Sequence, residues 1–276
     1  MKFYKYTGLG NDFVLINNLK CNVDIDSRLA KAMCDRHFGI GADGIVLASP
    51  SKSCDIRMEI YNSDGSIAEM CGNASRCFAK FCYEKNLIKR ESFTVETLAG
   101  TIVPKLYIED GIVKNVTVDM GQPKFGSKDI PFKVNLDKVV DYPIRIDGKE
   151  YIITSMFMGV PHTVVFTDEI EDEKVIAEGR KIETSEYFPR KTNVNFASII
   201  NRNEIVLRTW ERGAGYTMAC GTGSCAAVVA GIESGRLNNK VKVHLRGGDL
   251  TIEWKVGEKV QMTGEAKEVF TGEYEI

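Results

Sequence analysis

Two short stretches of the chain have nearly the same sequence: Met70-Cys71-Gly72-Asn73-Ala74-Ser75-Arg76-Cys77 and Ala219-Cys220-Gly221-Thr222-Gly223-Ser224-Cys225. In each stretch a cysteine and a glycine stand at the start of a segment with the pattern of a helix. The first turn of a helix has unpaired backbone N–H groups and the positive end of the helix dipole, and both favour an anion. Each stretch can therefore hold a thiolate or a bound carboxylate, and two of them indicate one active site built from two halves.

The same spacing relates other parts of the chain. Landmarks of the first half recur in the second half at a constant distance: Cys71 and Cys220, and Asn62 and Glu211, are 149 residues apart, and Asp12 and His162, and Asp43 and Asn193, are 150 apart. A constant spacing over several landmarks indicates a duplicated unit. Residues 121–137 contain Gly, Pro and Lys without periodicity, so this stretch is the candidate crossover between two domains.

Helical periodicity predicts four helices, and alternating apolar residues predict strands for most of the rest. The expected helices cover residues 27–38, 74–85, 168–185 and 224–234. The second and fourth of them are apolar on more than one side, which predicts that both are buried.

The composition argues against several classes of partner. The 276 residues carry a net charge of -2, which gives no electrostatic reason to expect nucleic acid or a membrane surface as a partner. No stretch approaches the roughly 18 apolar residues of a membrane span, and the first residues do not have the features of a signal peptide. Eight cysteines without an export signal are expected to be reduced thiols of a cytoplasmic protein.

The cysteines and histidines do not predict a metal site. No C-x2-C pair occurs, and His37, His162 and His244 are scattered without the spacing of metal ligands. We therefore expect no metal.

Two equivalent thiols at helix starts suggest a particular reaction. If they face each other, one as thiolate can remove a proton from carbon while the other as thiol delivers a proton to the opposite face, which is two-base racemisation or epimerisation. Thiol pKa values are expected to be lowered at helix starts. The substrate would be an α-amino acid, because backbone N–H groups of Gly72, Asn73, Gly221 and Thr222 would hold its carboxylate and the charge that develops there.

Six blocks of sequence, in order and over nearly the whole chain, closely resemble the diaminopimelate epimerase family: Gly8-Leu9-Gly10-Asn11-Asp12-Phe13, Tyr61-Asn62-Ser63-Asp64-Gly65, Cys71-Gly72-Asn73, Met158-Gly159-Val160-Pro161-His162, Thr192-Asn193-Val194-Asn195-Phe196, and Glu211-Arg212-Gly213 through Ala219-Cys220-Gly221-Thr222-Gly223. The resemblance implies conversion of LL-2,6-diaminopimelate to meso-diaminopimelate on the route to lysine and peptidoglycan, without pyridoxal phosphate, metal or other cofactor.

The resemblance also implies the roles of individual residues. Cys71 and Cys220 match the catalytic cysteines, and His162 and Glu211 match residues that tune those thiols. The remaining matches are substrate-binding: Asn11 near the reacting amino group, Glu211 and the helix-start residues Gly72, Asn73, Gly221 and Thr222, and Asn62, Asn193 and Arg212 at the distal amino-acid head. A bidentate guanidinium suits a second carboxylate well.

The fold implied by the resemblance is of the α/β class in its α+β form. It has two pseudo-symmetric domains, each a curled mixed sheet wrapped around a central helix. Residues 1–121 and a returning C-terminal segment, 266–276, are expected to form the N-terminal epimerase domain, and residues 122–265 the C-terminal one. Members of the family commonly form homodimers.

The chain departs from the family pattern at positions of the substrate-recognition shell. Val160 replaces an asparagine, Gly44 stands where some members have glutamine, Tyr216 replaces a glutamate, and Ala74-Ser75 replace Gly-Ala. These changes leave open a related cofactor-independent racemase acting on another amino acid. An alternative from another class is a thiol redox or ligand-binding protein, because two thiols across a cleft could form a disulfide.

Overall fold

The computed structural model describes residues 1–275, which divide into two compact units. Unit 1 comprises Met1–Asp119 together with the described residues from Thr263 onward, and unit 2 comprises Met120–Met262. The chain thus passes from one unit to the other twice. The strand β18, Gln261–Gly264, contains the second crossing.

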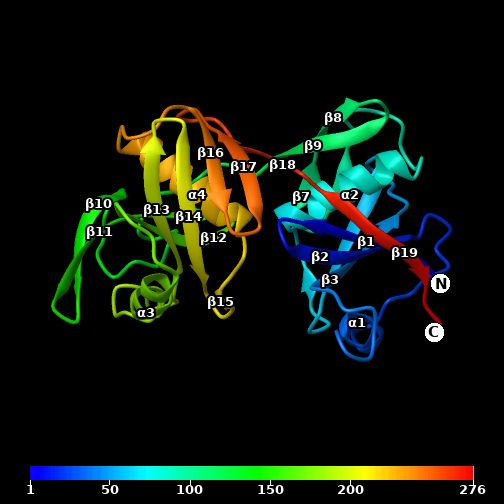
Figure 1. Cartoon of the computed structure of the whole chain (residues 1–276), viewed down its shortest axis with the longest axis horizontal. Helices are drawn as coiled ribbons and strands as arrows, with labels where there is room; N and C mark the ends of the chain where they lie inside the picture. The colour runs from blue at the N-terminus through cyan, green and yellow to red at the C-terminus, as the bar shows by residue number, and fades with distance from the viewer. Residues whose placement is uncertain (276) are drawn as a thin grey trace. The chain divides into compact units, whose positions relative to one another are not determined.

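Unit 1 contains a mixed sheet in the order β19-β1-β2-β3-β4-β6-β7, with β5 paired to β4 (Figure 1). The strands β8 and β9 form an antiparallel hairpin. The strands are β1 Lys2–Gly8, β2 Asn11–Asn17, β3 Gly44–Ser49, β4 Ile56–Asn62, β5 Ile67–Ala68, β6 Val95–Thr97, β7 Gly100–Ile102, β8 Lys105–Glu109, β9 Ile112–Asp119 and β19 Lys267–Glu273; the helices are α1 Ser27–Cys34 and α2 Gly72–Glu84.

Unit 2 repeats this plan with the strand order β10-β11-β12-β13-β14-β16-β17, and with β15 paired to β14. Its strands are β10 Val139–Ile146, β11 Lys149–Met158, β12 Val160–Phe166, β13 Asn193–Asn201, β14 Glu204–Glu211, β15 Gly215–Tyr216, β16 Lys240–Leu245 and β17 Gly248–Glu253; the helices are α3 Asp172–Glu183 and α4 Gly221–Glu233.

In both units, a helix connects the two strands of each parallel pair. In unit 1, α1 joins the parallel pair β2 and β3, and α2 joins the parallel pair β4 and β6. In unit 2, α3 joins β12 and β13, and α4 joins β14 and β16. The register is shared too: Phe13 pairs with Gly44, and Thr163 pairs with Val194, each residue 150 positions further on. The predicted α+β class with two sheet-rich domains is confirmed.

The second helix of each unit is buried in its sheet. Ten consecutive residues of α2, from Asn73 to Cys82, are buried, and so are nine of α4, from Gly223 to Gly231. Each large apolar side chain buried in this way contributes roughly 1.5–3 kcal/mol, so these helices anchor the segments that precede them. In Figure 1, α2 lies among the strands of unit 1 and α4 among the strands of unit 2.

Helix ends differ in part from the sequence prediction. Both buried helices begin at the glycine directly after the cysteine, two or three residues earlier than periodicity predicted. The first helix ends at Cys34 and does not extend to Phe38, because the Asp35 carboxylate accepts the backbone N–H groups of His37 and Phe38 and forms a turn. The predicted helix 27–38 would have placed His37 in its last turn, but in the structure His37 lies beyond the end of α1.

Candidate active site

Cys71 and Cys220 occupy the same local position in the two units. Each is the N-cap residue, with extended backbone, of α2 or α4. The Cys71 carbonyl accepts the backbone N–H and the hydroxyl of Ser75, both at 2.8 Å. The Cys220 carbonyl accepts the same two groups of Ser224, both at 2.9 Å. The predicted placement of both thiols at helix starts is thus what the structure shows within each unit.

In unit 1, a chain of oriented amides lies next to the Cys71 segment. The guanidinium of Arg76 donates to Asn73 Oδ1 at 2.8 Å, and Asn73 Nδ2 donates to Asn11 Oδ1 at 3.3 Å. Asn11 Nδ2 then donates to a carboxylate oxygen of Asp43. The predicted substrate residues Asn11 and Asn73 are therefore in direct contact. The oxygen and the nitrogen of each amide already have a hydrogen-bond partner within unit 1.

Two cations hold the carboxylates at the end of this chain. Arg36 Nη2 donates to Asp12 Oδ1 at 2.7 Å and to Asp43 Oδ1 at 2.8 Å, and Lys5 pairs with Asp12 at 2.5 Å. Burial opposes ionisation of Asp12, but hydrogen bonds from Arg36 and Lys5 outweigh it and lower its pKa to about 2. Asp12 therefore stays ionised near neutral pH and fixes the hairpin tip that carries Asn11.

Asn62 lies at the end of β4, at the edge of the sheet where this network is found. The backbone N–H of Ser63 donates to the Asp43 carbonyl at 3.0 Å, which ties the Asn62 turn to the network. The side chain of Asn62 donates to Ser66 Oγ at 2.9 Å. This hydrogen bond stabilises the turn that follows β4.

In unit 2, the Cys220 thiol is enclosed by its own helix start. Its sulfur accepts the backbone N–H of Gly223 at 3.3 Å and lies 3.5 Å from Thr222 Oγ1. Glu211, whose carboxylate accepts the Thr217 hydroxyl at 2.7 Å, also interacts with this thiol. Cys220 is only 5% exposed.

The pKa of the Cys220 thiol is raised, which corrects the expectation that helix starts lower it. Burial is the largest cause, and the negative charge of Glu211 adds to it. Hydrogen bonds from Thr222 and from the Gly223 backbone oppose the shift without overcoming it. The Cys220 thiol is therefore protonated near neutral pH.

The predicted distal residues Asn193 and Arg212 are in contact. Asn193 Oδ1 accepts the backbone N–H of Arg212 at 2.7 Å, and Asn193 Nδ2 donates to the Pro161 carbonyl at 3.1 Å. Both polar atoms of the Asn193 side chain thereby hold the backbone. Among the described residues, the exposed guanidinium of Arg212 donates only to the Arg190 carbonyl, at 3.1 Å through Nη1. The rest of its planar fork can therefore approach a carboxylate.

His162 is fully buried in β12 next to these residues. Burial, and secondarily the positive charge of Arg212, lower its pKa to about 3, so the ring is neutral near pH 7. Nδ1 lies 3.2 Å from Asn195 Nδ2. Nε2 is buried and has no hydrogen-bond partner among the residues that the structure describes.

Three supporting residues were missed by the sequence analysis. Arg76 and Asp43 orient Asn73 and Asn11, and Asn195 contacts His162. Signals for two of them existed: Asp43 is a landmark of the 150-residue repeat, and Asn195 is a polar residue two positions after Asn193 in a buried strand. Arg76 had no such signal, because a charged residue in a helix is ordinarily exposed.

Two departures from the family pattern are explained by packing. A Cβ at Gly44 would lie 2.7 Å from the backbone carbonyl of Tyr61, so this backbone has no room for a side chain there. Ser75 is buried and bonded to the Cys71 carbonyl. Both positions therefore support the local backbone.

Tyr216 also faces the interior of unit 2. Its hydroxyl donates to Asp172 at the start of α3, and its ring lies under the Arg246 guanidinium, 5.4 Å from the ring centroid. Val160, the first residue of β12, is half-buried. The structure gives no packing or bonding explanation for Val160.

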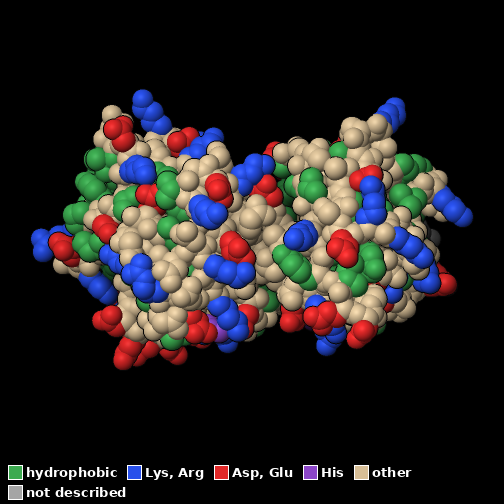
Figure 2. Space-filling view, turned by 90° about the horizontal axis from the view of Figure 1, so that it is seen from above, with side chains coloured by type: hydrophobic (Ala, Val, Ile, Leu, Met, Phe, Trp, Pro, Cys, Tyr) green, Lys and Arg blue, Asp and Glu red, His purple; other side chains and the backbone are tan. Residues whose placement is uncertain are grey.

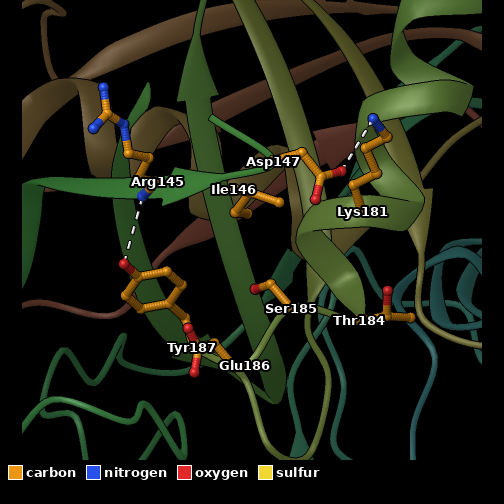
Figure 3. Close-up of a pocket in the computed structure, with 8 residues that line it drawn as sticks. All are labelled: Arg145, Ile146, Asp147, Lys181, Thr184, Ser185, Glu186 and Tyr187. Carbon is orange, nitrogen blue, oxygen red and sulfur yellow. Dashed lines mark hydrogen bonds and ion pairs between the residues drawn. The ribbon is translucent and has the colours of Figure 1, made fainter. Parts of the chain in front are cut away.

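Two pockets, each within one unit, are lined by residues outside the cysteine segments. One, of about 340 Å³, is found in unit 2 at the end of α3 (Figure 3) and is lined by Arg145, Ile146, Asp147, Lys181, Thr184, Ser185, Glu186 and Tyr187. Another, of about 470 Å³, is found in unit 1 and is lined by Lys80, Glu84, Lys85, Gly111, Ile112, Ala266, Lys267 and Glu268. Neither includes a predicted site residue.

Charged side chains of both signs are distributed over the surface visible in Figure 2, in keeping with the small net charge. Among residues 1–275, no group of three or more His, Cys, Asp or Glu is arranged to hold a metal ion. Within the same residues, no helix is both long and apolar enough to span a membrane.

Comparison with known proteins gives close relatives over the full length. A family model described as diaminopimelate epimerase matches residues 3–126 and 154–269. A diaminopimelate epimerase from Pelotomaculum thermopropionicum is 50% identical, with 99% of each chain covered. One from Caldanaerobacter subterraneus subsp. tengcongensis is 49% identical, with 100% of each chain covered.

Solved structures with low sequence identity share the fold. A probable proline racemase from Agrobacterium radiobacter aligns with a TM-score of 0.70 at 14% identity, over 100% of this chain and 93% of that one. A PhzF-family phenazine biosynthesis protein from Bacillus anthracis aligns with a TM-score of 0.70 at 15% identity, over 100% and 99%. These two likenesses show a common architecture.

Proposed function

This chain belongs to the diaminopimelate epimerase family, as its motifs indicated, and we propose that it interconverts LL-2,6-diaminopimelate and meso-diaminopimelate in the formation of lysine and peptidoglycan precursors. The enzyme class is isomerase. The observation that carries the proposal is the matched position of Cys71 and Cys220 as N-cap residues of two equivalent buried helices, with full-length relatives of the same named activity.

The proposed reaction is a proton transfer between two thiols through the α-carbon. One cysteine, as thiolate, removes the α-proton, and the other, as thiol, delivers a proton to the opposite face; the roles exchange in the reverse direction. The raised pKa of Cys220 supports its role as the proton donor at the start of one direction. Glu211, beside that thiol, is placed to stabilise its protonated form and to tune its release.

Substrate binding is assigned to both helix starts and to the polar residues around them. First-turn N–H groups of Gly72, Asn73, Gly221 and Thr222 would hold the carboxylate next to the reacting carbon, where negative charge grows as the proton leaves. Asn11 would lie near the reacting amino group. Arg212, supported by Asn193, and Asn62 would hold the distal amino-acid head.

No pyridoxal phosphate or metal is required by this proposal, because the thiols carry out both proton transfers. We assign the N-terminal epimerase domain to residues 1–121 and 266–276, and the C-terminal one to residues 122–265. The two compact units and the repeat of about 150 residues support this assignment. We further propose a cytoplasmic location, supported by eight cysteines that form no disulfide within the described part of the chain.

A homodimer is also proposed. The strand β19 stands at the end of the unit 1 sheet order, and its residues Val269 and Phe270 are 53% and 46% exposed. A sheet edge with exposed apolar side chains is a surface on which another chain can add a strand.

Proton exchange in heavy water tests the function directly. The reduced protein is incubated with diaminopimelate and with a panel of other amino acids, and deuterium at the α-carbon is measured by NMR. Exchange with diaminopimelate supports the proposal, preference for another amino acid identifies a related racemase, and exchange with none of them rejects both.

Cysteine variants test the two-base mechanism. Cys71→Ala and Cys220→Ala should each lower epimerisation by about 1,000-fold or more, because a positioned acid or base typically contributes 10²–10⁴-fold. Cys34→Ala is the control, since this thiol packs in the unit 1 core. Circular dichroism should show folded protein in all three. An active Cys71→Ala or Cys220→Ala variant would contradict the assignment.

A further inference from the structure

Asn195 is a fully buried amide at the centre of unit 2. Its Nδ2 lies 3.2 Å from the Thr163 carbonyl and 3.2 Å from His162 Nδ1. Its Oδ1 accepts the Thr209 hydroxyl at 3.1 Å. Every polar atom of this side chain thus has a partner inside the protein, so its position is strongly specified.

These partners determine the orientation of the amide. A backbone carbonyl can only accept a hydrogen bond, so the atom next to the Thr163 carbonyl must be the donor, Nδ2. The other N–H of the same group then points to His162 Nδ1. Because a donor faces it, Nδ1 cannot carry a proton, and the proton of the neutral ring must be on Nε2.

We propose that Asn195 is a positioning residue, which holds His162 in the neutral form protonated on Nε2 and so makes it a buried hydrogen-bond donor and not a proton acceptor. The inference deepens the proposed function and rests on it for the role in the reaction. It specifies how His162 can tune a thiol: by donating to a negatively charged acceptor, a thiolate or the substrate carboxylate, and not by taking the proton of a thiol.

The surroundings of His162 agree with a donor role. Nε2 is buried and has no acceptor among the described residues, and a buried donor without a partner carries an uncompensated desolvation cost. Such a cost is recovered when an acceptor binds. Arg212 is the charged group that acts on the ring, and its positive charge disfavours a second ring proton in the same way as the Asn195 amide does.

The tautomer can be measured without any activity assay. Because the chain has three histidines, the ring nitrogens of the ¹⁵N-labelled wild-type protein can be assigned with His37→Gln and His244→Gln variants. We expect Nδ1 of His162 to resonate as an unprotonated nitrogen near neutral pH and to show a coupling across the hydrogen bond to Asn195 Nδ2. A proton on Nδ1, or a doubly protonated ring, would overturn the proposal.

Asn195→Asp tests whether the residue sets the tautomer. A carboxylate only accepts hydrogen bonds, so it should draw the His162 proton to Nδ1 and leave Nε2 as an acceptor. Thr209→Val, which removes another hydrogen bond of the same amide at nearly constant volume, is the matched control and should leave the proton on Nε2. An unchanged tautomer in a folded Asn195→Asp protein would overturn the proposal, and the wild-type coupling stands as the test if that variant does not fold.

The role in the reaction is read from kinetics. Asn195→Asp should lower kcat about 100-fold, as loss of one donor in a catalytic site does, with a smaller change in KM. Wild-type kcat in a protein whose tautomer is inverted would show that Asn195 does not position His162 for the reaction. If the wild-type protein exchanged no α-proton of diaminopimelate, the proposed function would fail, whereas the tautomer would still be decided by NMR.

Discussion

Gly223 is a residue whose lack of a side chain the site requires. A Cβ built on Gly223 would lie 2.3 Å from Asn195 Oδ1 and 3.2 Å from Cys220 Sγ. Asn195 cannot move aside easily, because its amide is bonded to Thr163 and Thr209 in a buried place. A single methyl group would therefore disturb both a thiol and the amide next to His162.

We expect Gly223→Ala to lower kcat by about 100-fold, because a displacement of about 1 Å in a catalytic site has effects of this size. Gly231→Ala in the same helix is the matched control, since its Cβ would meet the Leu237 side chain at 2.3 Å, away from the thiol. Both changes should lower the free energy of unfolding by about 1–3 kcal/mol. Proton-exchange assays and urea unfolding measure the two effects, and equal loss of kcat in both variants would contradict the prediction.

Asp43 is expected to act through the orientation of Asn11. Its carboxylate accepts from Asn11 Nδ2, so Asp43→Asn would place an amide N–H against another N–H or against Arg36. We predict that KM rises about 10-fold, the cost of one hydrogen bond to a charged group. Asp35→Asn, at an exposed turn, should leave KM unchanged. Steady-state kinetics decide, and an unaltered KM in Asp43→Asn would show that the amide chain does not serve binding.

Sequence patterns predicted the buried helices α2 and α4, but not their first residues or the hydrogen bond between Asn195 and His162. Periodicity identified the segments after Cys71 and Cys220 because a helix that is apolar on several sides has few alternatives. It placed their starts two or three residues late, because the N-cap role of a cysteine has no strong propensity signal. The pairing of Asn195 with His162 joins two strands and could not be inferred from local sequence.

Strands β14, β16 and β17 each contribute one side chain to a charged cluster on the surface of unit 2. His244 on β16 donates or accepts through both ring nitrogens, at 2.7 Å from Glu204 and 2.8 Å from Asp249. The hydrogen bond to Glu204 is the largest cause that raises its pKa above 6.5, and burial opposes it. Asp249 is shared with Lys242, so the cluster is a small network.

This network predicts a pH-dependent contribution to stability. A raised pKa in the folded state means that the stabilisation is fully present below the unfolded pKa of 6.5 and is lost as pH rises through the folded pKa. His244→Gln should therefore lower the urea midpoint at about pH 6 and have a smaller effect at about pH 9. His37→Gln, an exposed histidine, is the control. If the difference in urea midpoint between wild type and His244→Gln grew with pH, the stabilising role of protonated His244 would be contradicted.

At the scale of the whole chain, duplication explains why two half-sites resemble each other and where they differ. The cysteine and its serine partner recur 149 residues apart with the same hydrogen bonds. The positions of Asp12 and His162, by contrast, have changed from an ionised carboxylate held by cations to a buried neutral ring. The repeat could be found from sequence spacing, whereas the electrostatic difference depends on burial that only tertiary structure creates.

The proposed dimer gives a prediction for the whole molecule. Val269→Lys places a charge on the outer edge of β19, and charged side chains at sheet edges oppose the addition of another strand. Sedimentation velocity should show the wild-type protein as a dimer and the variant as a monomer. Val256→Lys is the control, because Val256 is 71% exposed in unit 2, and it should remain dimeric. Both side chains are exposed, so neither change should alter the urea midpoint appreciably. A wild-type monomer, or a Val269→Lys dimer, would exclude β19 as the interface.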